Sequence, residues 1–156
     1  MNPQPRLCVV VLPALPESVP LLRRIVRYEA ARWLLPEDAG EALQLVVSEL
    51  AGNVVLHSGS PYVALFVRVD EDALTVKVRD GGSWEGGSGG GAREDGECCG
   101  RGLDLVGAVA SRFTLVRGSC GTEAVAELDL GPSGPVSPAV PKRRASEEHL
   151  ALSISV

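Results

Sequence analysis

Two glycine-containing turns divide the sequence into two apolar parts, and they constrain where its strands and helices can begin and end. The first (DGG, residues 80–82) ends a run of alternating apolar residues, and the second (GRGL, residues 100–103) begins another apolar segment. The residues between them are rich in glycine and acid and almost lack large apolar side chains, apart from Trp84. A stretch this long inside a compact domain is usually a functional lid or a disordered segment. A functional lid or a disordered segment is therefore expected at about residues 82–99.

Length and charge restrict the class of protein. The chain has 156 residues, 45% of them apolar, which is enough for one domain with a real core. Its formal net charge is -5. Proteins that bind nucleic acid through a broad electrostatic footprint are usually basic, so we expect no direct contact with DNA.

The cysteines and the apolar segments indicate the compartment. Cys98 and Cys99 are adjacent, which makes them a poor disulfide pair, and they lack the spacing of a zinc site. Reduced thiols are therefore expected. The N-terminus lacks the features of a secretion signal, and no apolar stretch is long enough to span a bilayer. These features predict a soluble cytoplasmic protein with no membrane partner.

The part of the chain before the first turn predicts a strand, two helices and a hairpin. Residues 6–12 form a short β-branched run typical of a strand. Apolar residues then recur at helical spacing after Ser18, the expected N-cap, and again over residues 37–57. Alternating runs at residues 62–69 and 74–80, joined by a polar turn, indicate the hairpin.

The part after the second turn predicts one helix and a second hairpin. Residues 102–110 have helical spacing, and residues 113–117 and 122–130 alternate like paired strands. The composition then shifts to Pro, Ser, Lys, Arg and Glu. We expect residues 1–131 to form the folded domain and residues 132–156 to be a disordered tail.

Four polar or flexible positions carry candidate chemistry. Glu49 and Asn53 lie four residues apart on the second predicted helix and so share a face, with Gly52 between them allowing close packing. An amide oxygen at Asn53 suits Mg²⁺, and Glu49 could take a proton or orient a water. Asp80 could accept a hydrogen bond from the amine of adenine, and Gly82 would let the backbone come close to the base. The alternative for Glu49 and Asn53 is that they are ordinary polar residues on the solvent side of a helix. The alternative for Asp80 is an ordinary Asp-Gly turn that ends a strand.

The second turn and the last strand add two more candidates. A helix that begins at a glycine-rich turn presents free backbone N–H groups to an anion, and Arg101 could add a charge-assisted contact to phosphate. Thr122 could stand beside Asp80 on an adjacent strand and share a water with adenine. The alternative for the turn is a glycine-rich start of a helix that binds no ligand. The alternative for Thr122 is an ordinary β-branched residue in a hairpin.

Four strings in combination resemble the motifs of a known ATPase-like domain. They are "VVSELAGNVVLHSG", "VKVRDGG", "GRGLDLV" and "GTEAVAEL". The domain is shared by gyrase, the ninety-kilodalton heat-shock chaperone, histidine kinases and the mismatch-repair ATPase, and the chain is most similar to the anti-sigma-factor serine kinases. The resemblance spans roughly residues 6–130. It implies an α+β fold, a two-layer α/β sandwich whose mixed, mostly antiparallel sheet is covered by helices on one face.

The resemblance also implies ligands and residue roles. ATP with Mg²⁺ would lie between the helices and under the lid, with Asn53 as the magnesium ligand and Glu49 as the catalytic base. The other ATP-binding positions that it implies are, on the adenine side, Asp80, Gly82 and Thr122 and, on the phosphate side, Gly100, Arg101, Gly102 and Leu103. One departure is Trp84, which stands where the family often has a second glycine.

Members of this family hold a sigma factor from RNA polymerase and phosphorylate a serine of an antagonist, the anti-anti-sigma protein. A chain of this kind would be an ATP-binding regulator with those two partners. The alternatives are a non-catalytic ATP-binding module that sequesters a partner, and a histidine-kinase catalytic domain acting in trans. Family members commonly dimerise, which leaves a homodimer open, with Leu21 or Leu22 at the contact.

Overall fold

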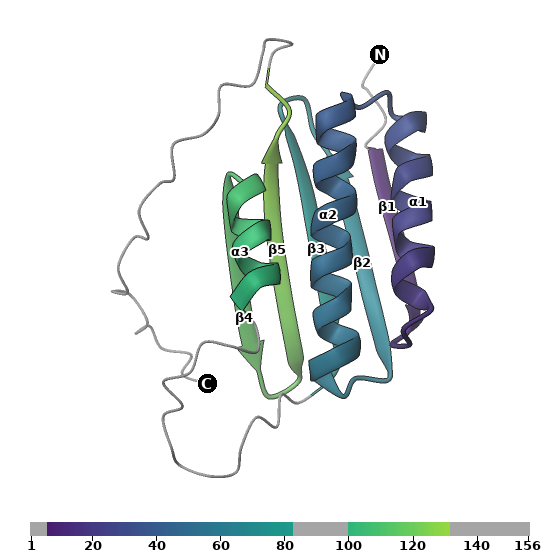
Figure 1. Cartoon of the computed structure of the whole chain (residues 1–156), viewed down its shortest axis with the longest axis vertical. Coiled ribbons are helices and arrows are strands. Elements are labelled where there is room, and N and C mark those ends of the chain that lie inside the picture. Colours follow the sequence, from purple (N-terminus) through teal and green to yellow (C-terminus); the bar gives the residue numbers. More distant parts are fainter. Residues whose placement is uncertain (1–5, 83–99, 132–156) are drawn as a thin grey trace, which may run out of the picture.

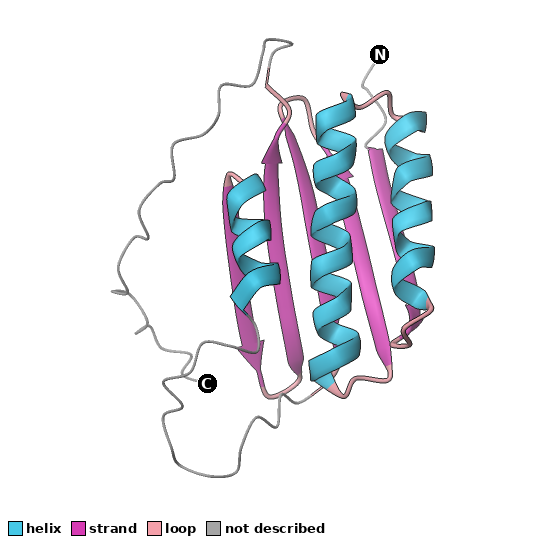
Figure 2. Cartoon of the chain, viewed as in Figure 1, coloured by secondary structure: helices cyan, strands magenta, loops and turns pink. Residues whose placement is uncertain are grey.

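The computed structural model describes residues 6–82 and 100–131. In this part of the chain, helices cover one face of a single sheet, so the molecule has two layers (Figures 1 and 2). The elements, in chain order, are β1 (Arg6–Pro13), α1 (Ser18–Arg32), α2 (Glu37–Asn53), a π-helical turn η1 (Val54–Ser58), β2 (Tyr62–Val69), β3 (Ala73–Asp80), α3 (Gly100–Val109), β4 (Arg112–Gly118) and β5 (Gly121–Asp129).

The sheet has five strands in the order β1-β2-β3-β5-β4, and each neighbouring pair is antiparallel. The predicted two-layer α+β fold is therefore confirmed, while the expected mixture with parallel strands is wrong for the described strands. The reason lies in the connections. Two helices of opposite direction join β1 to β2, so the chain returns to the sheet antiparallel, and tight hairpins join β2 to β3 and β4 to β5.

Valine and leucine side chains fill the layer between the helices and the sheet. Helix α2 lies over the middle of the sheet and buries Leu43, Val46, Val47 and Leu50, which recur at helical spacing. Alternate residues of β3 and β5 point toward these side chains and are buried. Because α2 is fixed over β3 and β5, the polar residues at its C-terminal end are held beside the ends of those strands.

Two expectations about α1 are wrong. Ser18 does not cap the helix, because its hydroxyl donates to the carbonyl of Pro13 (2.7 Å), and the cap position is Glu17, without a side-chain hydrogen bond. Leu22 is fully buried in the core and so is excluded from a dimer contact, whereas Leu21 is 41% exposed. The helical stripe therefore turns Leu22 inward and leaves Leu21 at the surface.

The helical segment Glu37–Ser58 corrects the expectation about apolar stretches. By length and composition alone it is long and apolar enough to cross a membrane. In the structure 44% of its most apolar window is buried, and its apolar side chains are the ones that pack over the sheet. A core helix satisfies the same criterion of length and hydropathy, so this segment is weak support for a membrane span.

Some predictions fall on residues that the structure does not describe. The lid beyond Gly82, the tail at residues 132–156, and Cys98 and Cys99 lie outside the described ranges. Of the remaining cysteines, Cys8 is half-buried on β1. Burial, together with the nearby carboxylate of Glu29, raises the pKa of the Cys8 thiol, so this thiol stays neutral and packs as an apolar group.

Candidate nucleotide site

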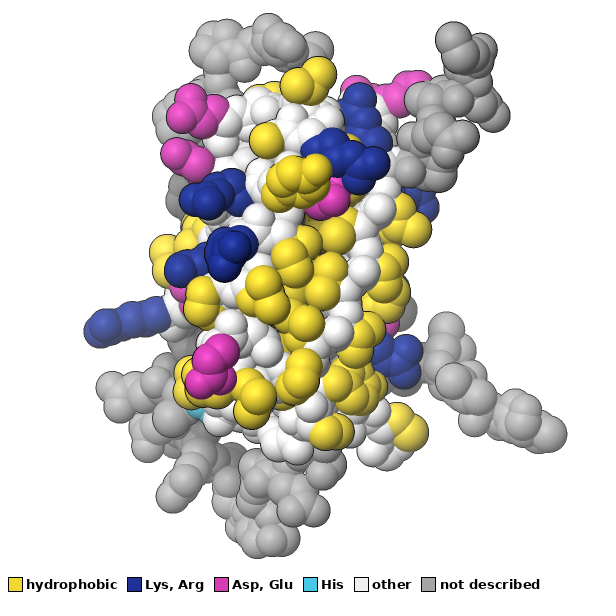
Figure 3. All heavy atoms as spheres, turned by 90° about the vertical axis from the view of Figure 1, so that its right-hand side faces the viewer, with side chains coloured by type: hydrophobic (Ala, Val, Ile, Leu, Met, Phe, Trp, Pro, Cys, Tyr) yellow, Lys and Arg dark blue, Asp and Glu magenta, His cyan; other side chains and the backbone are white. Residues whose placement is uncertain are grey.

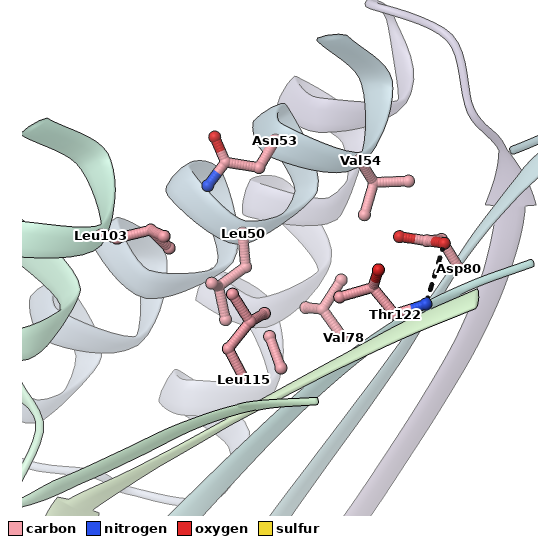
Figure 4. A pocket seen from close by; sticks show the side chains of 9 residues that line it. Leu50, Asn53, Val54, Val78, Asp80, Leu103, Leu115 and Thr122 are labelled. Atoms are coloured by element: carbon pink, nitrogen blue, oxygen red, sulfur yellow. Dashed lines mark hydrogen bonds between the residues drawn. The ribbon is translucent and has the colours of Figure 1, made fainter. Parts of the chain in front are cut away.

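The candidate residues from distant parts of the sequence meet at one end of the sheet. There, the end of α2, the end of β3, the start of β5 and the start of α3 surround a cavity (Figures 1 and 4). The side chains that line it come from six elements and are mostly apolar: Leu50, Asn53, Val54, Val78, Asp80, Leu103, Leu115, Thr122 and Ala124.

Asp80 is the buried acid of this cavity, and only 1% of it is exposed. Its Oδ1 accepts hydrogen bonds from the backbone N–H of Gly82 (3.0 Å) and from that of Thr122 (3.2 Å). The described residues give no hydrogen bond to its other oxygen, which points toward the cavity (Figure 4). A buried carboxylate is costly unless it is hydrogen-bonded. One oxygen is therefore used to hold the residue in place, and the other is left for a donor inside the cavity.

Thr122 provides a second polar group at the same point. Among the buried side-chain polar atoms of the described residues, its Oγ1 alone has no hydrogen-bond partner. Such unpaired groups are rare in folded proteins and call for a ligand or an ordered water. The predicted neighbourhood of Thr122 and Asp80 on adjacent strands is confirmed. An apolar slot that ends in a free carboxylate oxygen and a free hydroxyl fits a flat heterocycle that carries an amine, such as adenine.

Two glycines allow the backbone around Asp80 to pack this closely. A Cβ on Gly82 would overlap the carbonyl oxygen of Ser58. Gly121 has a φ of +131°, and a Cβ there would overlap the carbonyl oxygen of Asp80. The close approach predicted at Gly82 was to the adenine base and stays a prediction, while the approach that the structure shows is to the backbone at the end of η1. Gly121 was not among the predicted site residues, although a glycine that opens a strand is a recognisable turn signal.

Sequence reasoning also missed two buried serines that connect the two halves of the site. The hydroxyl of Ser60 accepts the N–H of Gly81 (3.0 Å) and donates to the carbonyl of Tyr62 (2.7 Å). The hydroxyl of Ser58 donates to the carbonyl of Val54 (2.7 Å) and accepts the N–H of Ser60 (3.0 Å). These bonds tie the π-helical turn after Asn53 to the turn after Asp80. The Ser-Gly-Ser-Pro string (residues 58–61) carried a signal for a hydrogen-bonded turn but not for its partners.

Asn53 and Glu49 lie on α2, but they face different neighbours. Asn53 is half-buried, and its side chain borders the cavity above Leu50 (Figure 4). Glu49 does not line the cavity. Its carboxylate lies against Gly102 in the first turn of α3, where a Cβ would overlap Oε2. A Cβ added to Gly52, between them, would meet no heavy atom within 4 Å, so a crowded helix crossing at this glycine is wrong for the described residues, while close packing against a ligand stays a prediction.

The start of α3 completes the site on the side opposite Asp80. The helix begins at Gly100, and Arg101 in its first turn is exposed, while Leu103 faces into the cavity. The N-terminal end of a helix carries a partial positive charge and unpaired N–H groups, which suit phosphate. The side chain of Asn53 borders the same cavity, and its amide oxygen is a hard ligand that suits Mg²⁺, with Glu49 one turn earlier on α2. The residues present therefore fit a magnesium nucleotide.

The cavity is nearly closed in this conformation. Its volume is about 20 Å³, which is room for roughly one water molecule. Leu103 of α3 lines the side of the cavity away from Asp80 (Figure 4). The cavity is therefore smaller than a purine and has to widen before it can admit one.

Comparisons with known proteins agree with this geometry. The sequence matches the family described as the histidine kinase-like ATPase domain over residues 12–127, which include most of the site. The fold resembles a solved structure of the RsbU and RsbW domains of Rv1364c from Mycobacterium tuberculosis, with a TM-score of 0.61 and 20% identity. The match covers 84% of this chain but only 34% of that one, and at this identity it speaks for the fold alone. A search of curated proteins finds no match.

Proposed function

Because the chain belongs to the histidine kinase-like ATPase domain family, we propose that it binds ATP with Mg²⁺ and transfers the γ-phosphate to a serine of a partner protein. The observation that carries the proposal is the paired polar end of the cavity. Among the described residues, one carboxylate oxygen of Asp80 and the buried hydroxyl of Thr122 have no hydrogen-bond partner, and the walls around them are mostly apolar. The amine of adenine would donate to Asp80, and a ring nitrogen would pair with Thr122 directly or through a water.

The triphosphate would extend from this end toward the start of α3. Gly100 and Gly102 open that helix, and the exposed guanidinium of Arg101 stands in its first turn. Asn53 would hold the magnesium ion. When bound, this ion neutralises charge on the phosphates and orients them. Leu103 would pack on the nucleotide in place of the closed contact that it makes here.

Glu49 is the proposed catalytic base. Its carboxylate already touches Gly102 in the first turn of α3, so a serine hydroxyl beside it would lie close to the phosphate end of the nucleotide. In the transfer, the serine Oγ forms a bond to the γ-phosphorus while the bond from that phosphorus to the bridging oxygen of ADP breaks. The serine proton passes to Glu49. General bases of this kind contribute about 10²–10⁴-fold to a rate.

Within the family, we assign the chain to the anti-sigma type, acting in the cytoplasm on a sigma factor and on an anti-anti-sigma protein that carries the phosphorylated serine. Two observations support this choice. The described domain is small and consists of the sheet and its helices, and its fold resembles a structure that contains an RsbW domain. Phosphorylation would release the antagonist and leave the sigma factor bound.

A homodimer through β1 is part of the proposal. This edge strand exposes Leu7, Val9 and Val11 by 51–60%, and Figure 3 shows an apolar patch along this side of the molecule. An unpaired edge strand with exposed apolar side chains tends to pair with another chain. Sedimentation equilibrium of the purified protein tests this point, and a monomer at micromolar concentration would refute it.

The experiment that tests the function combines calorimetry with a transfer assay. ATP is titrated with and without Mg²⁺, and labelled ATP is then incubated with candidate antagonist proteins from the same organism, followed by phosphoserine analysis. Asn53→Ala should abolish the magnesium-dependent part of ATP binding. Glu49→Gln should preserve ATP binding and slow transfer by about 10²–10⁴-fold.

Glu41→Gln is the matched control, because it makes the same change on an exposed position of the same helix. It should leave both ATP binding and transfer unchanged. Transfer by the Glu49→Gln protein at the wild-type rate would remove Glu49 as the base. ATP binding without transfer to any antagonist would favour the alternative, a non-catalytic module that sequesters its partner.

A further inference from the structure

A second, larger cavity lies between α1 and α2, on the side of these helices that faces away from the sheet. It is an open groove of about 490 Å³. Three arginines of α1 line it, Arg23, Arg24 and Arg27, and α2 contributes Gln44, Ser48 and Glu49. The buried apolar residues of both helices point the other way, into the core. The groove is therefore a surface feature formed by two rigid helices.

The charge of this groove is opposite to that of the whole protein. The chain has a net charge of -5, yet three exposed guanidiniums stand together here, and within the described residues none of them forms an ion pair. The single acid that lines the groove is Glu49. Basic side chains are also visible along the helix side of the molecule in Figure 3. Such a local concentration of positive charge attracts an anionic partner.

Glu49 connects the groove with the nucleotide site. It lines the groove, and its carboxylate also touches Gly102 at the start of α3. A group bound in the groove next to Glu49 thus lies on one side of this carboxylate, and the phosphate end of the nucleotide site lies on the other. A general base needs this arrangement, because it must contact the attacking hydroxyl close to the phosphorus.

The shape of the groove indicates what kind of anion it takes. The arginines are exposed rather than buried around one point, so they suit several charges spread along a segment and not one small enclosed ion. The lining contains no aromatic side chain on which a base could stack. An acidic stretch of polypeptide satisfies both conditions.

We propose that this groove receives an acidic segment of the protein whose serine is phosphorylated. Acidic residues beside the serine contact Arg23, Arg24 and Arg27, and the serine hydroxyl lies at Glu49. The inference rests on the proposed kinase function and adds to it the class of substrate: a serine with acidic neighbours. The ion pairs are exposed, so they steer and select the partner more than they add to affinity.

The test uses three labelled peptides with one serine each, flanked by Glu and Asp, by Gln and Asn, or by Lys. Fluorescence anisotropy with the full chain measures binding, and labelled ATP measures transfer. The acidic peptide should bind and react about tenfold better than the neutral one. The triple variant Arg23→Glu, Arg24→Glu, Arg27→Glu should reverse the preference toward the Lys peptide, while ATP affinity changes by less than about threefold.

The matched control reverses three arginines on the uncovered face of the sheet, Arg68→Glu, Arg79→Glu and Arg112→Glu. The total charge change is the same, so this protein should retain the preference for the acidic peptide. Melting temperatures verify folding of both triple variants. If the groove variant does not fold, the Arg→Gln triple replaces it and should bring the acidic and neutral peptides to equal binding.

The outcomes separate the two proposals. Equal binding of all three peptides, or an equal loss of preference in the control triple, overturns the groove as the docking surface. Equal rates of transfer to the serines of all three peptides would also overturn the groove as the docking surface, but would leave the kinase function intact. Groove-dependent binding of the acidic peptide without transfer supports docking and overturns the kinase assignment.

Discussion

Two cavities flank helix α2, and they are built in opposite ways. The pocket toward α3 is small and mostly apolar, and two of its three polar side chains, Asp80 and Thr122, are buried. The groove toward α1 is about 25 times larger, at about 490 Å³ against about 20 Å³, and its three arginines are exposed. A small flat ligand is recognised by groups that cannot move, whereas a flexible partner segment is selected by long charged side chains at a surface.

The difference originates in the backbone. Around the pocket, the turns after Asn53 and Asp80 are locked together by Ser58 and Ser60, and Gly82 lies directly against the backbone there. No such contacts are needed for the groove, where side chains project from two regular helices. Changes to the packed backbone around the pocket should therefore affect folding as well as nucleotide binding, while changes to the three arginines of the groove should affect partner binding alone.

The largest expected effect comes from adding a methyl group at Gly121, where β5 begins beside the backbone of Asp80. Gly121→Ala requires a left-handed φ and places a Cβ on the carbonyl of Asp80, so the free energy of unfolding should fall by about 2–4 kcal/mol. Thermal unfolding should show a melting temperature lower by roughly 10–20 °C.

Gly52→Ala is the matched control for that change, since a Cβ at Gly52 meets nothing and the position is helical. It should raise the free energy of unfolding by about 0.5–1 kcal/mol. A similar melting temperature for the two alanine variants would show that the backbone around Gly121 is packed less tightly than in the structure.

A smaller but more specific effect is expected from Asp80→Asn. The amide oxygen can still accept both backbone N–H groups, so folding should be almost unchanged. The amide NH₂ would then face the amine of adenine, donor against donor, and ATP affinity should fall about 10–100-fold.

Calorimetry with ATP and with inosine triphosphate, whose base has a carbonyl in place of the amine, checks the prediction. The variant should prefer the inosine nucleotide, and Asp104→Asn on the exposed side of α3 should behave like wild type. Binding of the acidic peptide to the groove should persist in both proteins. Unaltered purine preference in Asp80→Asn would remove Asp80 as the residue that reads adenine.

Thr122→Val should act in opposite directions on stability and on binding. Removing a buried hydroxyl without a partner should raise the free energy of unfolding of the ligand-free protein by about 1 kcal/mol, and ATP affinity should fall about threefold to tenfold. Chemical denaturation and calorimetry measure the two quantities. Thr114→Val on β4, at an exposed position, should change neither, and a loss of stability in Thr122→Val would mean that the hydroxyl is already satisfied.

The smallest expected effect is a difference between the two cavities in how strongly salt weakens binding. Raising sodium chloride from about 50 to about 300 mM should weaken binding of the acidic peptide about threefold to tenfold, because exposed charges are screened. Binding of adenosine, which is uncharged, should change less than about twofold since its partners are buried. Fluorescence of the labelled peptide and calorimetry of adenosine give the two curves, and parallel curves would contradict the contrast between pocket and groove.

Much of the fold was predictable because its signals are local. Alternating apolar residues identified both hairpins, and the stripe of α2 identified the helix that covers the sheet. The predicted strand end at Asp80 is the one observed, and the strand predicted to begin at Thr122 begins one residue earlier, at Gly121, so the neighbourhood of Asp80 and Thr122 could be anticipated. The π-helical turn η1 was not predictable, since the predicted helix simply continued through it.

The wrong predictions about α1 share one cause: the local sequence does not show which distant residues will pack against a side chain. Ser18 has the composition of an N-cap, but a carbonyl of β1 is close enough to take its hydroxyl. Leu21 and Leu22 are equally apolar, and only packing against α2 and the sheet distinguishes the buried one from the exposed one. The arginines of α1 are close together in the sequence, but their nearness to Glu49 depends on how α1 packs against α2.

By itself, the sequence determined the succession of helices and strands and the residue types that a nucleotide site needs, because hydrophobic periodicity and turn chemistry act over a few neighbouring residues. Only the tertiary structure decided that one oxygen of Asp80 accepts two backbone hydrogen bonds while the other receives none from the described residues, and that Glu49 lies between an arginine groove and the start of α3. Those contacts join residues that are far apart in the chain. They exist only after the helices and the sheet have packed, since packing alone sets the distances between them.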